Sequence, residues 1–259
     1  MDARSIVRLM NEEEQAVLRA LTKAEADIAV AGEKAAQAFQ TGGRIIYVGA
    51  GTSGRIATMD AAEMPPTFGL DPNPFLAIVA GGNAADRKAN ETAEDDEHEA
   101  ISALNALSLG PKDIVFGIAA SGRTPFVIAA IRHAAQKGLW TCAIANNKEA
   151  PLFDHAEHHI LIETGPEVLT GSTRLKAGTG QKLVLNRIST IAMVLSGKVI
   201  ENLMVDVNAK NAKLKERCVR IVRDLSTATE DEAARLLEEN QWSIRAVLDL
   251  LRPTKISQS

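Results

Sequence analysis

A short apolar run followed by a glycine-rich turn constrains the fold of this chain more than any other feature. Arg44 to Val48 favours a β-strand and leads directly into Gly49, Gly51 and Gly54. A helical pattern begins near Ser53. Because an apolar run without polar alternation is buried on both faces, it is typical of a strand inside a parallel sheet. The stretch therefore predicts a strand, a tight turn and a helix start, in that order.

The alternation of strand and helix patterns continues along the chain. Further apolar runs that resemble strands lie at residues 75–80, 114–118, 140–144 and 160–162. Helical patterns begin near Ser53, Ala84, Thr124 and Ala150. We therefore expect an α/β fold with a parallel sheet of about five strands and helices on both sides. A ligand site should lie beyond the carboxyl ends of the strands.

Helical patterns also flank this central region. Apolar residues recur at spacings of three and four between residues 3 and 39, and a long helix is expected over residues 174–195. Two short amphipathic helices are expected within residues 227–251. We therefore divide the chain into an N-terminal helical segment (1–40), a central domain (41–200) and a C-terminal helical subdomain (201–259).

The composition narrows the class of ligand. The formal net charge of −4 argues against general nucleic-acid binding, because phosphate backbones are bound by basic surfaces. Aromatic residues make up 3% of the chain, so few side chains can stack on bases. No apolar run approaches the roughly 18 to 20 residues of a membrane span, and residues 1–14 do not resemble a secretion signal. We expect a cytoplasmic protein that binds no membrane and takes a small polar ligand.

The first turn has two interpretations. Its three glycines match G-x-G-x-x-G, a pattern that also occurs in dinucleotide sites. Such a site needs an acid near the end of the second strand, where this chain has Gly81 and Gly82. A nicotinamide or flavin cofactor is therefore not expected. Gly51, Thr52 and Ser53 would instead present N–H and hydroxyl groups at a helix N-terminus to a sugar or a phosphate ester.

A second turn of the same kind follows the third strand. Ser121, Gly122, Arg123 and Thr124 precede Pro125, which is tolerated in the first turn of a helix. This loop is the preferred candidate for binding a phosphate group. The alternative is an ordinary helix cap, in which Ser121 or Thr124 serves only the helix.

A third hydroxyl-rich segment precedes the long helix. Ser172, Thr173, Arg174 and Lys176 lie at its start, and Glu167 is a few residues before them. We predict that this segment, with Ser172 and Lys176 in particular, forms a wall of the site. Helix capping plus surface charge is the alternative.

The histidines and cysteines suggest no metal site. His155, His158 and His159 lie close together in sequence, but no second group of ligands accompanies them. Surface or strand-edge roles are favoured for these residues. Cys142 and Cys218 have no metal-type spacing and are expected to be buried thiols.

A set of motifs in fixed order extends over most of the chain. They are GAGTSGR, DAAEMPPTFG, AEDDE, GIAASGRTP, GPEVLTGSTRLKAGTGQKLVLN and NLMVDVNAKNAKL. Together, from about Ile6 to Leu251, they resemble the N-acetylmuramic acid 6-phosphate etherases of the sugar isomerase (SIS) domain superfamily. The resemblance implies a flavodoxin-like three-layer α/β/α sandwich, with residues 41–200 as the SIS domain. It also implies a homodimer that cleaves the lactyl ether of N-acetylmuramic acid 6-phosphate, giving N-acetylglucosamine 6-phosphate and D-lactate.

The resemblance assigns the catalytic roles to Glu63 and Glu94. Once the sugar ring opens, the C2 proton lies next to the C1 aldehyde and a carboxylate can remove it. Glu94 is implied as that base, and Glu63 as the acid that protonates the departing lactyl oxygen. The apolar neighbours of Glu63, such as Met64 and Phe68, favour a protonated acid. Water then adds at C3, and no metal or redox cofactor is required.

Three expectations remain open at this point. Glu63 would reach the first turn only if the segment from Pro65 to Gly69 folds back over the site. Both ends of the chain look shorter than in the resembled family, which would reduce activity or stability if the extra segments close the site or the dimer. A non-catalytic sugar-phosphate regulator and an aldose–ketose isomerase are the competing functions.

Overall fold

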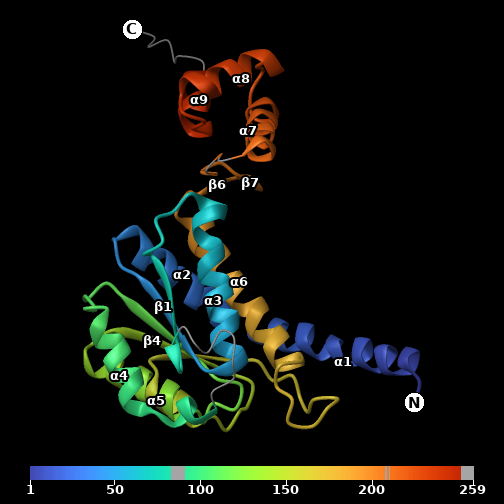
Figure 1. The fold of residues 1–259 in the computed structure, drawn as a ribbon, viewed down its shortest axis with the longest axis vertical. Coiled ribbons are helices and arrows are strands. Elements are labelled where there is room, and N and C mark those ends of the chain that lie inside the picture. Colours follow the sequence, from blue (N-terminus) through green and yellow to red (C-terminus); the bar gives the residue numbers. More distant parts are fainter. Residues whose placement is uncertain (83–90, 208, 210, 252–259) are drawn as a thin grey trace. The chain divides into compact units, whose positions relative to one another are not determined.

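The computed structural model describes residues 1–82, 91–207, 209 and 211–251 (Figure 1). These residues form two compact units. The first unit comprises Met1–Ala62 and Pro72–Ser196, and the second comprises Glu63–Asp71 and Gly197–Ser259. The division at residues 40 and 200 stays a prediction from the sequence.

The first unit is built on a five-stranded parallel sheet. Its strands are β1 (Ile45–Gly49), β2 (Phe75–Val79), β3 (Ile114–Ile118), β4 (Trp140–Ala145) and β5 (His158–Leu161). They lie in the order β2-β1-β3-β4-β5, and each neighbouring pair is parallel. Every residue of β1 and of β3 is buried, because these strands are interior and covered on both faces. The predicted parallel α/β sheet is confirmed.

Helices cover both faces of this sheet (Figure 1). The described helical segments of the unit are α1 (Ala3–Lys23), α2 (Glu25–Gln40), α3 (Gly51–Phe68, whose residues from Glu63 onward belong to the second unit), η2 (Glu91–Asp95), α4 (Glu97–Ala106), α5 (Pro125–Gln136), η3 (Pro151–His155) and α6 (Lys176–Leu195). Ile46, Val48 and Val115 share a buried core with α4 and α5. Tyr47 points to the opposite face, because successive strand residues alternate, and its hydroxyl group donates a hydrogen bond to Asp60 of α3.

Two helix predictions have different outcomes. The helix expected near Ala150 is wrong as an α-helix, because residues Pro151–His155 form a short 3₁₀ turn beginning with a proline. The helix expected from near Ala84 falls on residues 83–90, which lie outside the described residues. The long helix expected over 174–195 is confirmed as α6.

The second unit is mostly helical. A two-stranded antiparallel ribbon, β6 (Val199–Ile200) and β7 (Leu203–Met204), precedes α7 (Ala212–Asp224), α8 (Glu230–Glu239) and α9 (Ile244–Leu251). The helices share a core that includes Cys218, Leu237 and Val247. The two predicted helices within residues 227–251 are thus confirmed.

One carboxylate ties the second unit together. Asp206 accepts a hydrogen bond from Arg245 Nε at 2.5 Å and pairs with Lys198 Nζ at 3.1 Å. The carbonyl oxygen of Asp206 also lies 2.0 Å from where a Cβ on Gly69 would be, and Gly69 has a φ of +62°. Only glycine fits at Gly69 without strain, because both the backbone conformation and the space exclude a side chain.

In the described part of the chain, no helix is sufficiently long and apolar to span a lipid bilayer.

Candidate active site

The turn between β1 and α3 forms the floor of the candidate site. Gly51 starts α3 with a φ of +52°, a conformation that glycine adopts readily. A Cβ on Gly49 would lie 2.8 Å from Gly54 N, and one on Gly54 would lie 2.6 Å from the Val79 side chain. The glycine pattern therefore allows α3 to approach β1 and β2 closely. As in any helix, the first backbone N–H groups of α3 have no partner within the helix.

Glu94 lies directly over this turn. Its Oε1 atom is 3.1 Å from where a Cβ on Gly51 would be, although Glu94 comes from the separate segment η2. Glu94 is half-buried. The N-terminus of α3 carries a partial positive charge, which stabilises a carboxylate at that place. The structure thus brings together Gly51 and Glu94, two of the predicted site residues, and puts a negatively charged group at the helix start.

Thr52 and Ser53 both face α6. Ser53 is buried, and its hydroxyl donates to Gln181 Oε1 over 2.8 Å. The methyl group of Thr52 lies 3.4 Å from where a Cβ on Gly178 would be. Neither Gln181 nor Gly178 was singled out from the sequence, because α6 is more than a hundred residues away from the turn it packs against.

The turn between β3 and α5 lies at the same edge of the sheet. Gly122 has a φ of +65°, and a Cβ there would lie 2.2 Å from the Cβ of Ala150. Ser121 Oγ accepts a hydrogen bond from Arg123 N at 3.2 Å, as in a local turn. Thr124 is the N-cap residue of α5, but its side chain makes no capping hydrogen bond. The capping alternative therefore does not describe Thr124, while Ser121 does have a local structural role.

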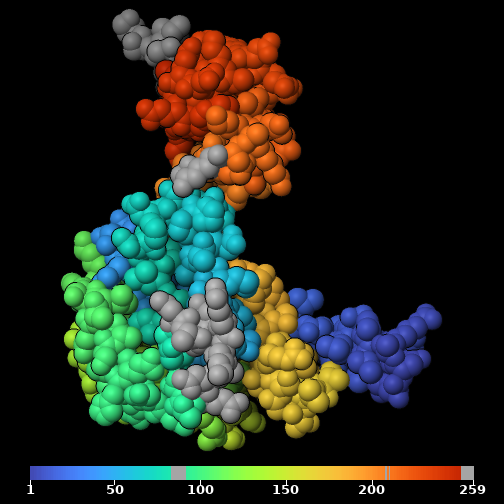
Figure 2. All heavy atoms as spheres, viewed as in Figure 1, coloured from blue at the N-terminus to red at the C-terminus, as the bar shows by residue number. Residues whose placement is uncertain are grey.

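The segment leading into α6 is organised by two glutamates. Glu167 accepts hydrogen bonds from Lys176 N at 3.1 Å and from Ala177 N at 2.9 Å, so it caps the helix. The Lys176 ammonium group is buried and pairs with Glu13 of α1 over 2.5 Å. Figure 2 shows the segment before α6 at the surface beside α1. Any ligand of Lys176 must share the ammonium group with Glu13, a residue that the sequence did not indicate.

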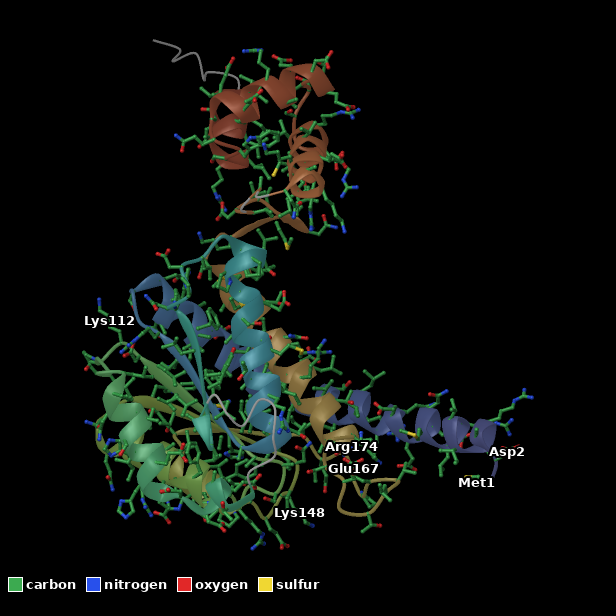
Figure 3. The ribbon with its side chains drawn as sticks, viewed as in Figure 1. Met1, Asp2, Lys112, Lys148, Glu167 and Arg174 are labelled. Carbon is green, nitrogen blue, oxygen red and sulfur yellow. The ribbon has the colours of Figure 1, made fainter. Side chains whose placement is uncertain are left out.

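Charged side chains are distributed differently along the two edges of the sheet. Arg174 and Lys148 follow strands at the carboxyl edge, whereas Lys112 precedes β3 at the amino edge (Figure 3). Arg174 and Lys148 are both exposed, and Ser172, in the same loop as Arg174, is half-buried. Two exposed cations therefore lie at the edge where both glycine turns lie, and either could attract an anionic ligand.

Glu63 does not lie where the sequence argument required. Helix α3 continues through Pro65 and Pro66 to Phe68, so the expected return of this segment over the turn is wrong. Glu63 is on the same helix as Gly51 but about three turns, or about 18 Å, further along its axis. Its side chain is exposed, so the expected apolar setting is wrong as well. Pro65 and Pro66 lack the N–H groups that would bond to the carbonyl groups of Ala61 and Ala62, so the helix lacks two hydrogen bonds in its last turns.

The buried carboxyl group of Asp60 joins α3 to β1 and α6. Asp60 accepts hydrogen bonds from Tyr47 Oη at 3.2 Å, Asn186 Nδ2 at 2.7 Å and Ser189 Oγ at 3.2 Å. Burial raises the pKa of Asp60, because desolvation of the carboxylate outweighs these three hydrogen bonds. Sequence reasoning missed Asp60, since an acid in a helix is more often a solvated residue.

The histidines have packing roles. His158 stacks on Trp140 with ring centroids 6.0 Å apart, and the ring of His159 lies 4.7 Å from that of Phe153. Within the residues that the structure describes, no three His, Cys, Asp or Glu side chains gather in a way that could hold a metal ion.

Two domain families match the first unit. The family described as "Glucokinase regulatory protein N-terminal SIS domain" matches residues 27–135, and the one described as "SIS domain" matches residues 95–185. The matched residues contain Gly51, Glu94 and both glycine turns, so the candidate site lies inside them.

Two relatives that match over most of this chain have the same name. The N-acetylmuramic acid 6-phosphate etherase of Geobacillus thermodenitrificans (strain NG80-2) is 50% identical over 253 residues, 97% of this chain and 86% of that protein. The protein of the same name from Histophilus somni (strain 129Pt) is 48% identical over 239 residues, 92% of this chain and 79% of that protein.

Solved structures support the fold. A phosphoheptose isomerase from Francisella tularensis superposes with a TM-score of 0.59 at 18% identity, covering 74% of this chain and 98% of that chain. At such low identity the likeness concerns the fold alone. It agrees with the parallel sheet covered by helices on both faces.

Proposed function

Because the chain belongs to the N-acetylmuramic acid 6-phosphate etherase family, we propose that it cleaves the lactyl ether of N-acetylmuramic acid 6-phosphate. The products are N-acetylglucosamine 6-phosphate and D-lactate, and the enzyme is a carbon–oxygen lyase. The observation that carries this proposal is the 50% identity across 97% of the chain, which includes both glycine turns and the helix α6.

Glu94 is proposed as the base at C2 of the open-chain sugar. Its carboxyl group lies beside Gly51 at the start of α3, and a carboxylate is a suitable base for this proton. The N–H groups at the start of α3 could stabilise negative charge that develops on the aldehyde oxygen when the C2 proton leaves. The reaction is an elimination followed by addition of water at C3, and it consumes no oxidant or reductant.

Glu63 is proposed as the acid that protonates the lactyl oxygen. Because α3 extends Glu63 away from its own Gly51 turn, we infer that a homodimer supplies Glu63 from a second copy to each site. Exposed apolar side chains on α1 support such an association: Ile6 is 43%, Val7 57% and Leu18 61% exposed.

The dimer proposal has its own test. Mixed dimers of Glu63→Gln and Glu94→Gln chains should regain up to about a quarter to a half of the activity that each variant alone has lost, since one site per mixed dimer receives both glutamates. Monomeric protein in sedimentation, or no recovery on mixing, would contradict it.

The phosphate group of the substrate is proposed to bind at the β3–α5 turn, through Ser121, Gly122, Arg123 and Thr124. The unused Thr124 hydroxyl and the start of α5 suit an anion. Gly51 and Thr52 of the first turn, with Ser172 and Lys176, are proposed to surround the sugar. A cytoplasmic role in recycling cell-wall sugars follows from this substrate.

Release of D-lactate is the direct test. The full chain is incubated with N-acetylmuramic acid 6-phosphate without added cofactor, and lactate is measured with a coupled dehydrogenase. Stoichiometric lactate and N-acetylglucosamine 6-phosphate are expected. Binding of the sugar phosphate without release of lactate would favour the second candidate, a non-catalytic regulator. The match of residues 27–135 to a glucokinase regulatory protein domain is the observation in favour of that candidate.

A further inference from the structure

Asp206 joins several parts of the second unit. Its carboxylate accepts hydrogen bonds from Arg245 of α9, from Nε at 2.5 Å and from Nη2 at 3.3 Å, and pairs with Lys198 Nζ over 3.1 Å. Arg245 Nη2 also donates to the carbonyl oxygen of Gly197. The Asp206 side chain is 17% exposed, so these charge-assisted bonds are partly shielded from water. Asp206, Arg245 and Lys198 are called the Asp206 cluster below.

The last turns of α3 belong to the same unit but are weakly held by the helix itself. The chain enters the second unit at Glu63. Pro65 and Pro66 have no N–H groups, so the carbonyl groups of Ala61 and Ala62 lose their partners in the helix at this place. Helices bend where such bonds are missing. The position of Glu63 therefore depends on what holds the segment that follows it.

The backbone of Asp206 holds the end of this segment. Gly69, the first residue after α3, has a φ of +62°, and the carbonyl oxygen of Asp206 lies 2.0 Å from where a Cβ on Gly69 would be. The two backbones are therefore in direct contact, with no side chain between them. Met64 and Phe68 are buried, whereas Glu63 is exposed. The segment is thus fixed at its end and through its buried side chains, and its carboxyl group is left free to meet a substrate.

We propose that Asp206 is a positioning residue for Glu63. Ion pairs with Arg245 and Lys198 fix Asp206, and the Asp206 backbone fixes the end of α3 through Gly69. The proposal rests on the proposed function, because it takes Glu63 as the acid that protonates the lactyl oxygen. It gives the helical second unit a part in the reaction, through a residue that acts on Glu63.

Two measurements separate the work of Glu63 from that of Glu94. In D₂O, each removal of the C2 proton by Glu94 ends with deuterium at C2, either in returned substrate or in the sugar product. Lactate is released only when the bond from C3 to the lactyl oxygen breaks and Glu63 gives its proton to that oxygen. A displaced Glu63 therefore lowers lactate release while deuterium still enters at C2. Damage to the whole site lowers both rates.

The main experiment applies both measurements to Asp206→Asn. The full chain is incubated with N-acetylmuramic acid 6-phosphate in D₂O, lactate is measured enzymatically, and deuterium at C2 is measured by NMR. Lactate release should fall about tenfold or more, because a small displacement of a catalytic group is costly. The rate of deuterium entry and the KM should change less than about twofold. Equal losses of both rates, or no loss of lactate release, would overturn the proposal.

A core variant controls for general loosening of the second unit. Leu237 of α8 is fully buried in the core of that unit and makes none of the bonds of the Asp206 cluster. Leu237→Val should lower the stability but leave the ratio of lactate release to deuterium entry unchanged. If it lowered this ratio as Asp206→Asn does, the ratio would report loosening alone and the proposal would fail.

Variants of Arg245 test whether the ion pair is what fixes Asp206. Arg245→Met removes both hydrogen bonds to the carboxylate and should lower the ratio in the same direction as Asp206→Asn. Arg245→Lys keeps the positive charge without the forked geometry and should recover part of the loss. A normal ratio in Arg245→Met, or no recovery in Arg245→Lys, would contradict the proposal.

Gly69→Ala provides a second variant should Asp206→Asn fail to fold. The added Cβ must push the end of α3 away from the Asp206 carbonyl group, so lactate release should fall while deuterium entry is retained. Gly42→Ala is the control, since Gly42 has a φ of +80° but no atom within 4 Å of its Cβ position. A normal ratio in Gly69→Ala, or the same fall in Gly42→Ala, would overturn the proposal.

Failure of this proposal can be distinguished from failure of the proposed function. If the wild type releases lactate and Asp206→Asn lowers both rates equally, the role of Asp206 is refuted and the etherase activity stands. If the wild type releases no lactate, the etherase activity is refuted, and amide hydrogen exchange of residues 67–71 still tests the contact. Exchange there should be about tenfold faster in Asp206→Asn than in the wild type. Unchanged exchange would show that Asp206 does not hold this segment.

Discussion

The two glycine turns after β1 and β3 have the same position in the sheet but different surroundings. Gly49 and Ile118, the last residues of their strands, are paired partners, so both turns begin at one level. At the first turn, the Ser53 hydroxyl group donates a hydrogen bond to Gln181 of α6, and the Glu94 carboxyl group lies beside Gly51. At the second, Thr124 makes no capping bond. One helix start therefore holds a protein carboxylate, while the other remains available to an anionic ligand.

The two turns have similar sequences but are expected to have different roles. A helix N-terminus attracts negative charge wherever it occurs, but the neighbouring side chains decide whether that charge belongs to the protein or to a ligand. Glu94 supplies the charge at α3. The second turn has no such residue in its own sequence, Ser121 to Thr124.

The largest expected effect comes from removing the carboxylate at the first turn. Glu94→Gln should lower the rate of lactate release by about 100-fold or more, because an amide cannot take the C2 proton. Sugar-phosphate binding should be retained, as calorimetry can verify. Glu97→Gln is the control, since Glu97 pairs with Arg132 on the surface and should be dispensable. Near-normal turnover of Glu94→Gln would remove Glu94 from the mechanism.

A side chain at Gly122 in the second turn is expected to lower the stability of the protein more than a side chain at Gly138. Gly122→Ala places a Cβ 2.2 Å from that of Ala150 at a φ of +65°. The free energy of unfolding should fall by about 2 to 4 kcal/mol, measured in denaturant. Gly138 has a φ of +76° but no atom within 4 Å of its Cβ position, so Gly138→Ala should cost only about 1 kcal/mol. Equal losses for the two variants would show that the close approach to Ala150 is unimportant.

A smaller effect is expected from replacing Thr124, the N-cap residue of α5 whose hydroxyl group makes no capping hydrogen bond. Thr124→Val should weaken binding of N-acetylglucosamine 6-phosphate about tenfold while leaving the thermal midpoint nearly unchanged, because no capping bond is lost. Thr58 is a matched control, since its hydroxyl donates to Gly54 O within α3. Thr58→Val should leave the affinity unchanged. A fall in stability without a fall in affinity would make Thr124 a structural residue.

The smallest expected effect concerns Asp60, whose buried carboxyl group joins α3 to β1 and α6. Burial raises the pKa of Asp60 in the folded protein, so the folded state binds its proton more tightly than the unfolded state does. Its contribution is therefore greatest below the ordinary Asp pKa and is lost as pH rises through the raised value. Asp60→Asn should accordingly gain stability relative to the wild type, by about 1 kcal/mol, between acid and neutral pH. If the denaturant midpoints of Asp60→Asn and of the wild type changed equally with pH, the predicted gain in stability of the variant would be contradicted.

Much of the fold could be predicted because its signals are local. The strand run before Gly49 and the helical spacing over residues 174–195 depend on neighbours only a few positions away. Both glycine turns could be recognised for the same reason. The end of α3 could not, because two prolines usually end a helix, whereas here the helix continues to Phe68.

The candidate site was only partly predictable. The family resemblance indicated Glu94, and the structure places it over Gly51. Its partner in the predicted pair, Glu63, is exposed on α3 and away from the turn on its own helix. Gln181 and Glu13 gave no sequence signal, since a glutamine or a glutamate in a helix is usually a solvated residue.

By itself the sequence determined the five parallel strands, the long helix over residues 174–195, the two glycine turns and the family. Periodicity and backbone conformation are properties of short stretches, so they can be derived without the fold. Only the tertiary structure decided that Ser53 donates to Gln181 and that Glu13 neutralises Lys176. Hydrogen-bond direction and the compensation of buried charge depend on partners that are distant in sequence and meet only when the helices pack on the sheet.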